Sequence, residues 1–497
     1  MLSSYRLGVF VCIFRIVLNE NTPGHNGSAL KVGDTTSNNI QCRGRRRGIK
    51  STCWGYEHDC NRKDLQFTPF CTKLHENVAR SLEEQAELFW NQADFGYISK
   101  MREKMLNLCK SNSFHGSWLK CTPDMVFCSA KNLVIDFSHL DFRSPTSIKT
   151  DIFNSGQIGG QCQLDKALLK KQNQMNFDLW SWYAELENYS SLDEFDDNDC
   201  DEVVSKPTIF VKLDSGFNMY HHFCDFINIY ISQHINGSDF STNVNIINWE
   251  VSSREYLDMF EETWRAFSKY PLLHLKRFKG KRVCFRDAFF SIPPRNAFTL
   301  YYNTPLVSDC YRSSLVRAFS EHILRRLNRK QEKYEDSIVR VTFLTRSTEF
   351  RKIINEDQLL RKMKKIKNVE VRKVDYNRHK TPFLRQLQIT SNTDVFIGIH
   401  GAGLTHFLFL PDWASGFEVY NTEDAPCYHD LSRLRGIQYF TWEDRSKFTV
   451  HDKGKDERYG EYPKFWNYSF DVEEFVRIFK RAVKHVVKNR PKFDACT

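Results

Sequence analysis

Short apolar runs and helix-like segments alternate through the C-terminal half of this 497-residue chain, and this alternation constrains the fold most. Strands that alternate with helices over short connections favour parallel sheets and an α/β fold. The pattern predicts strands at residues 338–345, 369–374, 395–399 and 417–420. It predicts helices at residues 314–327, 356–365 and 383–390, after Gly403, and from Val472 onward.

A second α/β pattern precedes this one. It predicts strands at residues 133–137, 207–213, 244–249 and 282–290, and helices at residues 219–234 and 254–270. Residues 19–130 are instead Cys-rich, with a helix expected at 76–90. We therefore expect a Cys-rich cap followed by two α/β domains, at 131–305 and 306–497. Two such domains would leave a cleft between them, where ligands of open α/β sheets bind.

The cysteines and the N-terminus indicate the compartment. Residues 1–18 place Arg6 before an apolar run that is long enough for a signal peptide and too short to span a bilayer. Removing Cys12 with that segment would leave fourteen of the fifteen cysteines, an even number suited to disulfides in the secretory pathway. Six of them crowd the N-terminal region at spacings that match no zinc site, which favours disulfides over metal: Cys53, Cys60, Cys71, Cys109, Cys121 and Cys128.

The net charge bears on the class of substrate, and the sequons agree with a lumenal protein. The net charge of +10 is spread along the chain, which suggests acidic small-molecule substrates more than nucleic acid. The basic run at 43–47 is either a flexible, solvated segment or a processing or import signal. N-x-S tripeptides predict glycosylation in the endoplasmic reticulum lumen, at Asn26, Asn188, Asn236 and Asn467.

A glycine turn follows the strand expected at 395–399. His400, Gly401, Ala402 and Gly403 separate that strand from a helix start. Glycines let the backbone approach a ligand, and free N–H groups at a helix start favour an anion such as a diphosphate. The spacing matches neither the dinucleotide fingerprint nor the P-loop, and an ordinary tight turn explains it equally well.

Candidate ligand contacts follow two of the predicted strands. Arg346 comes directly after the strand at 338–345 and Arg351 lies five residues further on, so a guanidinium can reach a diphosphate from the strand's end. Glu418 and Tyr420 alternate with apolar residues and can face a ribose or a base. Surface salt bridges for the arginines, and a half-buried strand for Glu418 and Tyr420, remain equal alternatives.

A histidine pair opens the helix at 219–234. His221 and His222 lie four and three residues before Asp225, so an imidazole and the carboxylate can share a helix face. Such a pair can orient a general base that deprotonates an acceptor hydroxyl. A stabilising pair within the helix, or a metal site completed from elsewhere in the chain, would show the same spacing.

Several longer stretches resemble glycosyltransferase family 61 and cover most of the chain after residue 50. They are residues 53–57, 92–97, 155–160, 219–230, 342–352, the Gly401 loop with 410–414, and 467–475. The resemblance implies a GT-B architecture, with two Rossmann-like domains facing a cleft. It also implies inverting transfer of N-acetylglucosamine from UDP-GlcNAc to Ser or Thr of folded EGF-like repeats. In that reaction His222 or Asp225 would be the base, the Gly401 loop and both arginines would bind the diphosphate, and Glu418 and Tyr420 would hold the nucleoside.

Two positions depart from the family pattern. Relatives carry Asp-Tyr-Asp before His-Leu-Lys, whereas this chain has Lys269-Tyr270-Pro271 before His274. The C-terminus, residues 492–497, lacks the retrieval signal of an endoplasmic reticulum protein. We expect no required cofactor, because GT-B enzymes commonly stabilise the leaving group without metal, and leave a divalent cation open. Alternatives are a catalytically silent protein that binds EGF repeats or glycans, and a related transferase that uses UDP-xylose or O-mannosylated acceptors.

Overall fold

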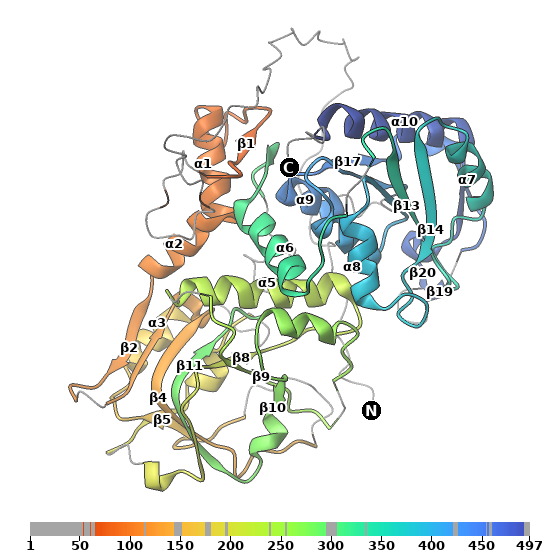
Figure 1. Ribbon diagram of the computed structural model, residues 1–497. Helices are drawn as coiled ribbons and strands as arrows, with labels where there is room; N and C mark the ends of the chain where they lie inside the picture. Colours follow the sequence, from red (N-terminus) through yellow and green to blue (C-terminus); the bar gives the residue numbers. More distant parts are fainter. Residues whose placement is uncertain are drawn as a thin grey trace.

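The computed structural model contains two large β-sheets. It describes Cys53, Cys60 and residues 65–113, 116–143, 152–173, 180–193, 197–237, 240–253, 256–294, 306–332, 335–420, 426–453, 455–456 and 460–491. The expected signal segment, Asn26, the basic run at 43–47 and residues 492–497 lie outside these residues. Figure 1 shows the two sheets apart from each other, with α5 (Met219–Ile235) between them.

The N-terminal sheet mixes parallel and antiparallel pairs. Its described strands are β2 Leu106–Lys110, β3 Trp118–Cys121, β4 Cys128–Asp136, β5 Ile158–Gly160, β6 Tyr189–Ser191, β7 Glu202–Val204, β8 Thr208–Val211, β9 Asn245–Asn248, β10 Leu273–His274 and β11 Arg282–Phe290. The main order is β10-β9-β8-β11-β4-β3-β2, and β5, β6 and β7 join at the side. The strands from β10 to β11 are parallel neighbours, whereas β11, β4, β3 and β2 pair antiparallel.

The boundary expected at residue 130 is wrong, because it falls inside β4. The Cys-rich region before it supplies β2 and β3 to the same sheet as β4. Only the earlier part of that region, with α1 (Leu82–Ala93) and α2 (Phe95–Glu103), stands outside the sheet. The Cys-rich region is therefore not a separate cap over its whole length.

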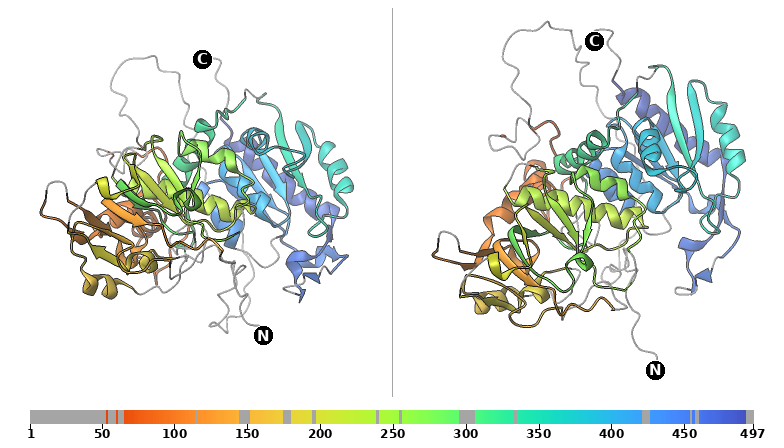
Figure 2. Two further views of the ribbon diagram at one scale, coloured as in Figure 1. Left: turned by 90° about the horizontal axis from the view of Figure 1, so that it is seen from below. Right: turned by 60° about the horizontal axis from the view of Figure 1, so that its bottom comes forward.

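The C-terminal sheet is parallel throughout its described strands. These are β13 Val339–Thr345, β14 Val369–Asp375, β15 Val395–Gly398, β16 Ser415–Glu418 and β17 Gln438–Thr441. Their order is β14-β13-β15-β16-β17. This is the doubly wound order in which the chain moves to both sides of its first strand. The expected α/β fold with parallel sheets is therefore confirmed. The two sheets also lie apart from each other in both views of Figure 2.

Helices cover both faces of the C-terminal sheet because successive side chains of a strand point to opposite faces. Val395 and Ile397 of β15 share a core with Phe475 of α10 (Val472–Asn489) and with α7 (Glu356–Lys364). Phe396, between them, packs against Phe407 of the 3₁₀ helix η6 (Ala402–Phe409), with ring centroids 6.0 Å apart. Helix α8 (Phe383–Ser391) packs against η6 on this second face.

Helix α5 joins the cores of the two halves. All of its residues are buried, which is typical of a helix that is enclosed on every side. Its Phe223 ring lies 5.5 Å from Phe409 of η6 and 5.9 Å from Phe383 of α8. The polar side chains of α5 therefore need partners inside the protein.

Disulfides staple the described chain, as the cysteine content predicted. The pairs are Cys53–Cys60, Cys71–Cys310, Cys109–Cys162, Cys121–Cys128 and Cys200–Cys284. Cys224 and Cys427 are buried and stand outside these five pairs, so the disulfides do not take in every cysteine of the described chain. No helix in the described part of the chain has the length and apolarity needed to cross a bilayer.

Most predicted elements are present within a few residues, including β11 at its predicted bounds. The helix expected at 254–270 is wrong: the described part of that segment holds only a short 3₁₀ helix, η4 (Glu261–Ala266). The segment after the glycine turn is also a 3₁₀ helix, and it begins at Ala402, before Gly403. The sequence reading missed β2, β3, β17 and α9 (Pro426–Arg435).

Candidate functional site

The C-terminal sheet reverses its winding between β13 and β15, because β14 and β15 lie on opposite sides of β13. Open parallel sheets bind ligands beyond the carboxyl ends of their strands at such a point. Arg346 follows β13 directly, and His400 and Gly401 come soon after β15. The first predicted arginine and the glycine turn therefore follow the two strands that flank this point.

Both predicted arginines converge on Gly401. A Cβ atom added to Gly401 would lie 2.5 Å from Nη1 of Arg346 and 3.1 Å from Nη1 of Arg351. The φ angle of Gly401, 152°, is also one that other residues rarely adopt. Only glycine fits here, because its backbone lies directly against two guanidinium groups. Gly403 has another role, since an added Cβ would lie 2.7 Å from the Leu344 side chain of β13.

Neither guanidinium group forms an ion pair within the described chain, although the charge of Asp375 acts on Arg346 from further away. The hydroxyl of Thr348 accepts a hydrogen bond from Nε of Arg346 at 3.3 Å. The guanidinium of Arg351 lies over the ring of Phe465, and its buried Nε has no hydrogen-bond partner among the described residues. Burial and then the charge of Arg351 lower the pKa of Arg346 to about 9, and burial lowers that of Arg351. Two half-buried like charges at one point favour binding of an anion.

His400 is anchored from the opposite side by Glu418. Its Nδ1 lies 2.7 Å from Oε1 of Glu418, and the hydroxyl of Tyr439 donates to Oε2 at 2.5 Å. Glu418 is completely buried, and burial together with its charge holds the pKa of Tyr439 well above the usual value. The carboxylate of Glu418 is therefore engaged by His400 and Tyr439, and the structure gives no support to the prediction that it faces a nucleoside.

Tyr420 belongs to the core. Its ring lies 4.8 Å from Phe448 and 5.1 Å from Tyr468, and the residue is 6% exposed. The alternating pattern of this strand came from burial on both faces, so the expectation of a base contact from Tyr420 is not met. His406, the second histidine of the glycine motif, is also buried and lies 3.0 Å from the Thr390 hydroxyl.

The second group of candidates opens α5. His222 lies between two carboxylates, with Nδ1 3.2 Å from Asp225 and Nε2 3.2 Å from Asp258. Burial opposes protonation of His222, but hydrogen bonds and charges from both carboxylates raise its pKa to about 9. Burial raises the pKa of Asp225 to about 6, against the effect of His222. A buried imidazole that holds its proton at neutral pH is unsuited to be the base, so the expected role of His222 is not supported.

The neighbouring histidine is closer to solvent. Nδ1 of His221 lies 2.5 Å from Oδ2 of Asp214, and the two side chains are 10% and 9% exposed. Asp225 accepts a hydrogen bond from the backbone N–H of Asp214 at 3.2 Å, so it fixes the loop that carries this carboxylate. The sequence-predicted Asp225 therefore supports the pair of His221 and Asp214.

Ring contacts connect the start of α5 with the arginines. Tyr220 packs against Tyr428 of α9 at 5.7 Å, and the Tyr428 ring lies 5.3 Å from that of His400. Tyr428 also interacts electrostatically with both Arg346 and Arg351. The start of α5 is thus connected with the arginine pair through Tyr220 and Tyr428. Sequence reasoning missed Tyr428, because no strand or helix was predicted around it.

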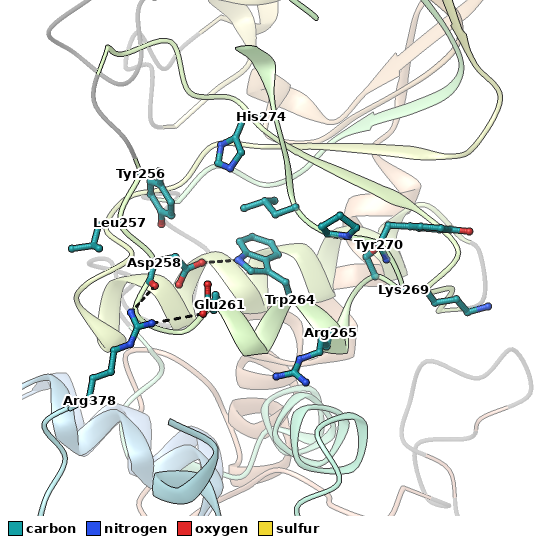
Figure 3. A pocket seen from close by; sticks show the side chains of 13 residues that line it. Tyr256, Leu257, Asp258, Glu261, Trp264, Arg265, Lys269, Tyr270, His274 and Arg378 are labelled. Carbon is teal, nitrogen blue, oxygen red and sulfur yellow. Dashed lines mark hydrogen bonds and ion pairs between the residues drawn. The ribbon is translucent and has the colours of Figure 1, made fainter. Parts of the chain in front are cut away.

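A hollow of about 710 Å³ lies beside this region (Figure 3). It is lined along η4 and its flanking segments, and by one residue of the C-terminal half, Arg378. Arg378 donates to the carbonyl of Asp258 at 3.2 Å and lies 3.7 Å from Glu261. Asp258 also accepts from the indole of Trp264 at 2.7 Å. Asp258 therefore connects the hollow with His222 and Asp225.

Comparison with known proteins identifies the family. The family model described as Glycosyltransferase 61 matches residues 203–416. An EGF domain-specific O-linked N-acetylglucosamine transferase of Canis lupus familiaris is 49% identical over 443 residues, which make up 89% of this chain and 84% of that protein. The chain belongs to glycosyltransferase family 61. Proteins with the same name from Xenopus laevis and Drosophila melanogaster are 48% and 42% identical, over 88% and 89% of this chain and 84% and 85% of theirs.

The departure from the family 61 pattern lies at the far end of the hollow. Tyr270 donates to Asn243 at 2.9 Å, and Nζ of Lys206 lies 3.1 Å from its ring centroid. Asn243 and Lys206 precede β9 and β8, so this segment lies at the amino ends of the strands. Lys269, Tyr270 and Pro271 offer no cation ligand set, and no described cluster of three His, Cys, Asp or Glu side chains suits a metal. The departure leaves every residue of the arginine site in place.

The described sequons of this family 61 chain differ in exposure. Asn236 is exposed at the end of α5. Asn188 is half-buried and donates to the carbonyl of Phe153 at 2.6 Å. Asn467 is 6% exposed, and its Nδ2 donates to Glu349 at 3.3 Å and Asp452 at 3.2 Å. A glycan on Asn467 would require these contacts to break, so the prediction for Asn467 conflicts with the structure.

Proposed function

We propose that this chain transfers N-acetylglucosamine from UDP-GlcNAc to Ser or Thr hydroxyls of folded EGF-like repeats. This proposal rests on the activity named for relatives that are 48% and 49% identical over most of the chain. The arginine pair supports it physically, because two half-buried guanidinium groups that form no ion pair in the described chain suit the diphosphate of a nucleotide sugar.

The proposed architecture is GT-B, with the donor on the C-terminal domain and the acceptor on the N-terminal one. The parallel C-terminal sheet, with its ligand residues beyond the carboxyl ends of β13 and β15, supports the donor half. The parallel strands β8, β9 and β10, with Asp214 beyond the end of β8, support the acceptor half. Tyr428 would lie where the two substrates approach each other.

In the proposed reaction the acceptor oxygen attacks the anomeric carbon of the donor as the bond to the diphosphate breaks. The electron pair of that bond leaves with UDP. Arg346 and Arg351 would stabilise the growing negative charge, with His400 and the backbone of Gly401 and Ala402 beside them. The charge on the diphosphate is larger after bond cleavage than before, so these cations act more strongly on the transition state than on the bound donor.

The acceptor hydroxyl must lose its proton, and we assign this role to His221. An imidazole paired with a carboxylate is a suitable general base, and Asp214 would stabilise the imidazolium that forms. Asp225 and His222 become positioning residues: Asp225 fixes the backbone of Asp214, and His222 holds Asp225 and Asp258. Their effect on the rate would pass through the geometry of His221.

We propose a secretory-pathway location in the endoplasmic reticulum lumen. Five disulfides among the described residues support an oxidising compartment. EGF-like repeats themselves fold in that compartment with disulfides. We also propose that no cofactor is required; a divalent cation is left to experiment.

Mass spectrometry of a folded EGF-like repeat incubated with the protein and UDP-GlcNAc tests the function. A gain of one N-acetylhexosamine supports the transferase, and a gain in the presence of EDTA supports metal-free transfer. Arg346→Ala serves as the inactive control. Binding of the repeat without any mass gain would instead favour the silent binding protein, and transfer from UDP-xylose alone would change the donor.

A further inference from the structure

Two large apolar side chains stand exposed on adjoining loops next to the proposed base. Phe217 is 65% exposed and Leu257 is 61% exposed, and among the described residues only Val487 of α10 is comparably exposed for a large apolar side chain. Phe217 lies between Asp214 and the start of α5, and Leu257 directly precedes Asp258. Exposed apolar side chains gathered at one place indicate an interaction surface.

The loops that carry Phe217 and Leu257 are fixed to each other. The N–H of Met259 donates to the carbonyl of Gly216 at 2.9 Å. A Cβ added to Gly216 would lie 2.3 Å from the carbonyl oxygen of Leu257 and 2.8 Å from the hydroxyl of Tyr256, so the two backbones touch. The apolar pair is therefore held in position before any partner binds, which reduces the entropic cost of association.

Leu257 also forms one end of the hollow along η4. Figure 3 shows Leu257 at one end, Lys269 and Tyr270 at the other, and Trp264 between them. The carboxylates of Asp258 and Glu261 line this hollow, and its cation from the C-terminal half, Arg378, already bonds to both residues. Arg265 and Lys269 also line it, so the hollow has mixed charge, and the diphosphate is assigned to the arginine pair near Gly401 instead.

The surface of a folded protein domain is chemically complementary to Phe217, Leu257 and the hollow. Its surface supplies apolar side chains for Phe217 and Leu257 and polar groups for the hollow, as in an interface with an apolar centre and a polar rim. We propose that Phe217, Leu257 and the hollow behind Leu257 form the docking surface for the folded acceptor domain. The identity of that domain as an EGF-like repeat rests on the proposed function, whereas the position of the surface rests on exposure, rigidity and closeness to Asp214.

Binding and transfer are measured separately with the full-length protein to test this inference. Immobilised folded repeat is titrated with wild type, with the double variant Phe217→Ser and Leu257→Ser, and with the control Val487→Ser. Val487 is 63% exposed on α10, so its replacement removes similar apolar surface elsewhere. The double variant is expected to bind the repeat about tenfold or more weakly, while Val487→Ser and the affinity of each variant for UDP stay unchanged.

Each outcome decides a different point. Equal binding of the repeat by wild type and double variant, or no binding by wild type, overturns the docking surface. Weaker binding only by the double variant supports it, even if no protein transfers sugar; absent transfer would then overturn the proposed function alone. The melting temperature of each variant is measured first, so that weaker binding is not caused by unfolding. The single variants Phe217→Tyr and Leu257→Met keep the apolar surface and are expected to retain binding.

Discussion

His400 is held in place by Glu418, whose carboxylate lies 2.7 Å from its Nδ1 while also accepting a hydrogen bond from Tyr439. The partners come from three consecutive strand regions of the sheet, since His400 follows β15, Glu418 ends β16 and Tyr439 lies in β17. The sheet thus orients the imidazole beside the arginine pair through neighbouring strands. An interaction of this kind fixes which ring nitrogen of a histidine carries the proton.

Replacing Glu418 by Gln tests this arrangement. The amide keeps the shape of the carboxylate but turns one acceptor into a donor, so it cannot accept from both His400 and Tyr439. We expect kcat/KM for UDP-GlcNAc to fall about tenfold, the effect of losing one hydrogen bond to a charged group. Tyr439→Phe leaves the bond to His400 and should cost much less. An equal decrease of kcat/KM in both variants would show that Glu418 and Tyr439 act through packing and not through the orientation of His400.

Removing either arginine should weaken donor binding. Arg346→Ala and Arg351→Ala each delete charge-assisted hydrogen bonds to the diphosphate, and UDP affinity measured by calorimetry is expected to fall about 10- to 100-fold. Arg346→Lys should recover only part of the loss, because an ammonium lacks the planar fork. Arg361→Ala on the exposed side of α7 is the control. Unchanged UDP affinity in both alanine variants would move the donor site elsewhere.

Gly401→Ala, compared with a second glycine variant, tests whether the site needs the close approach of the arginines to Gly401 or only its backbone conformation. The added methyl group would lie 2.5 Å from the Arg346 guanidinium, so we expect loss of UDP binding together with reduced stability. Gly156→Ala is matched to it, because Gly156 also has a positive φ, 91°, but open space around its Cβ position. That control should lower stability by about 1 kcal/mol and leave UDP affinity unchanged. Normal UDP binding by Gly401→Ala would contradict the tight contact.

The sequence predicted Arg346 and the glycine turn as ligand residues because both follow predicted strands, and parallel sheets bind ligands beyond the carboxyl ends of their strands. The run Val395–Gly398 is apolar on both faces, which marks a buried parallel strand, and Val339–Thr345 is buried along most of its length. The structure makes β13 and β15 parallel neighbours, so their carboxyl ends lie at one edge and bring Arg346 and Gly401 together. The alternation around Glu418 carries no such information, because a buried strand and a ligand-facing strand look alike until the neighbours are known.

The choice between His221 and His222 was beyond sequence reasoning. Adjacent helical residues point about 100° apart, and the carboxylates they meet come from three separate segments, at Asp214, Asp225 and Asp258. The segment around Asp258 was also mispredicted as helix. There Asp258 accepts from the N–H of Phe260 at 2.7 Å and from the indole of Trp264, so local side-chain bonds hold a loop where helix propensity was high.

Glycan occupancy should follow exposure. The Asn236 side chain lies at the surface, whereas Nδ2 of Asn467 is enclosed by Glu349 and Asp452. Peptide mass spectrometry of protein secreted from eukaryotic cells, before and after enzymatic removal of N-glycans, is expected to find a glycan at Asn236 and none at Asn467. A fully occupied Asn467 would show that the loop around it packs differently.

The buried position of His222 makes stability depend on pH. Against the effect of burial, Asp225 and Asp258 raise the pKa of His222 to about 9 in the folded protein. A histidine in the unfolded chain has a pKa of about 6.5. Between these values the folded state binds more protons, so this contribution to stability is complete below about pH 6.5 and is lost as the pH rises through about 9.

Urea unfolding at intervals between pH 6 and 9.5 measures this dependence, and the slope due to one proton cannot exceed about 1.4 kcal/mol per pH unit. Asp225, with its pKa raised to about 6, has largely titrated by pH 7 and adds little above it. His222→Gln should be less stable at pH 7, and its free energy of unfolding should change less with pH than that of wild type. Parallel curves for the two proteins would mean that His222 is neutral in the folded state, and would restore it as a candidate base.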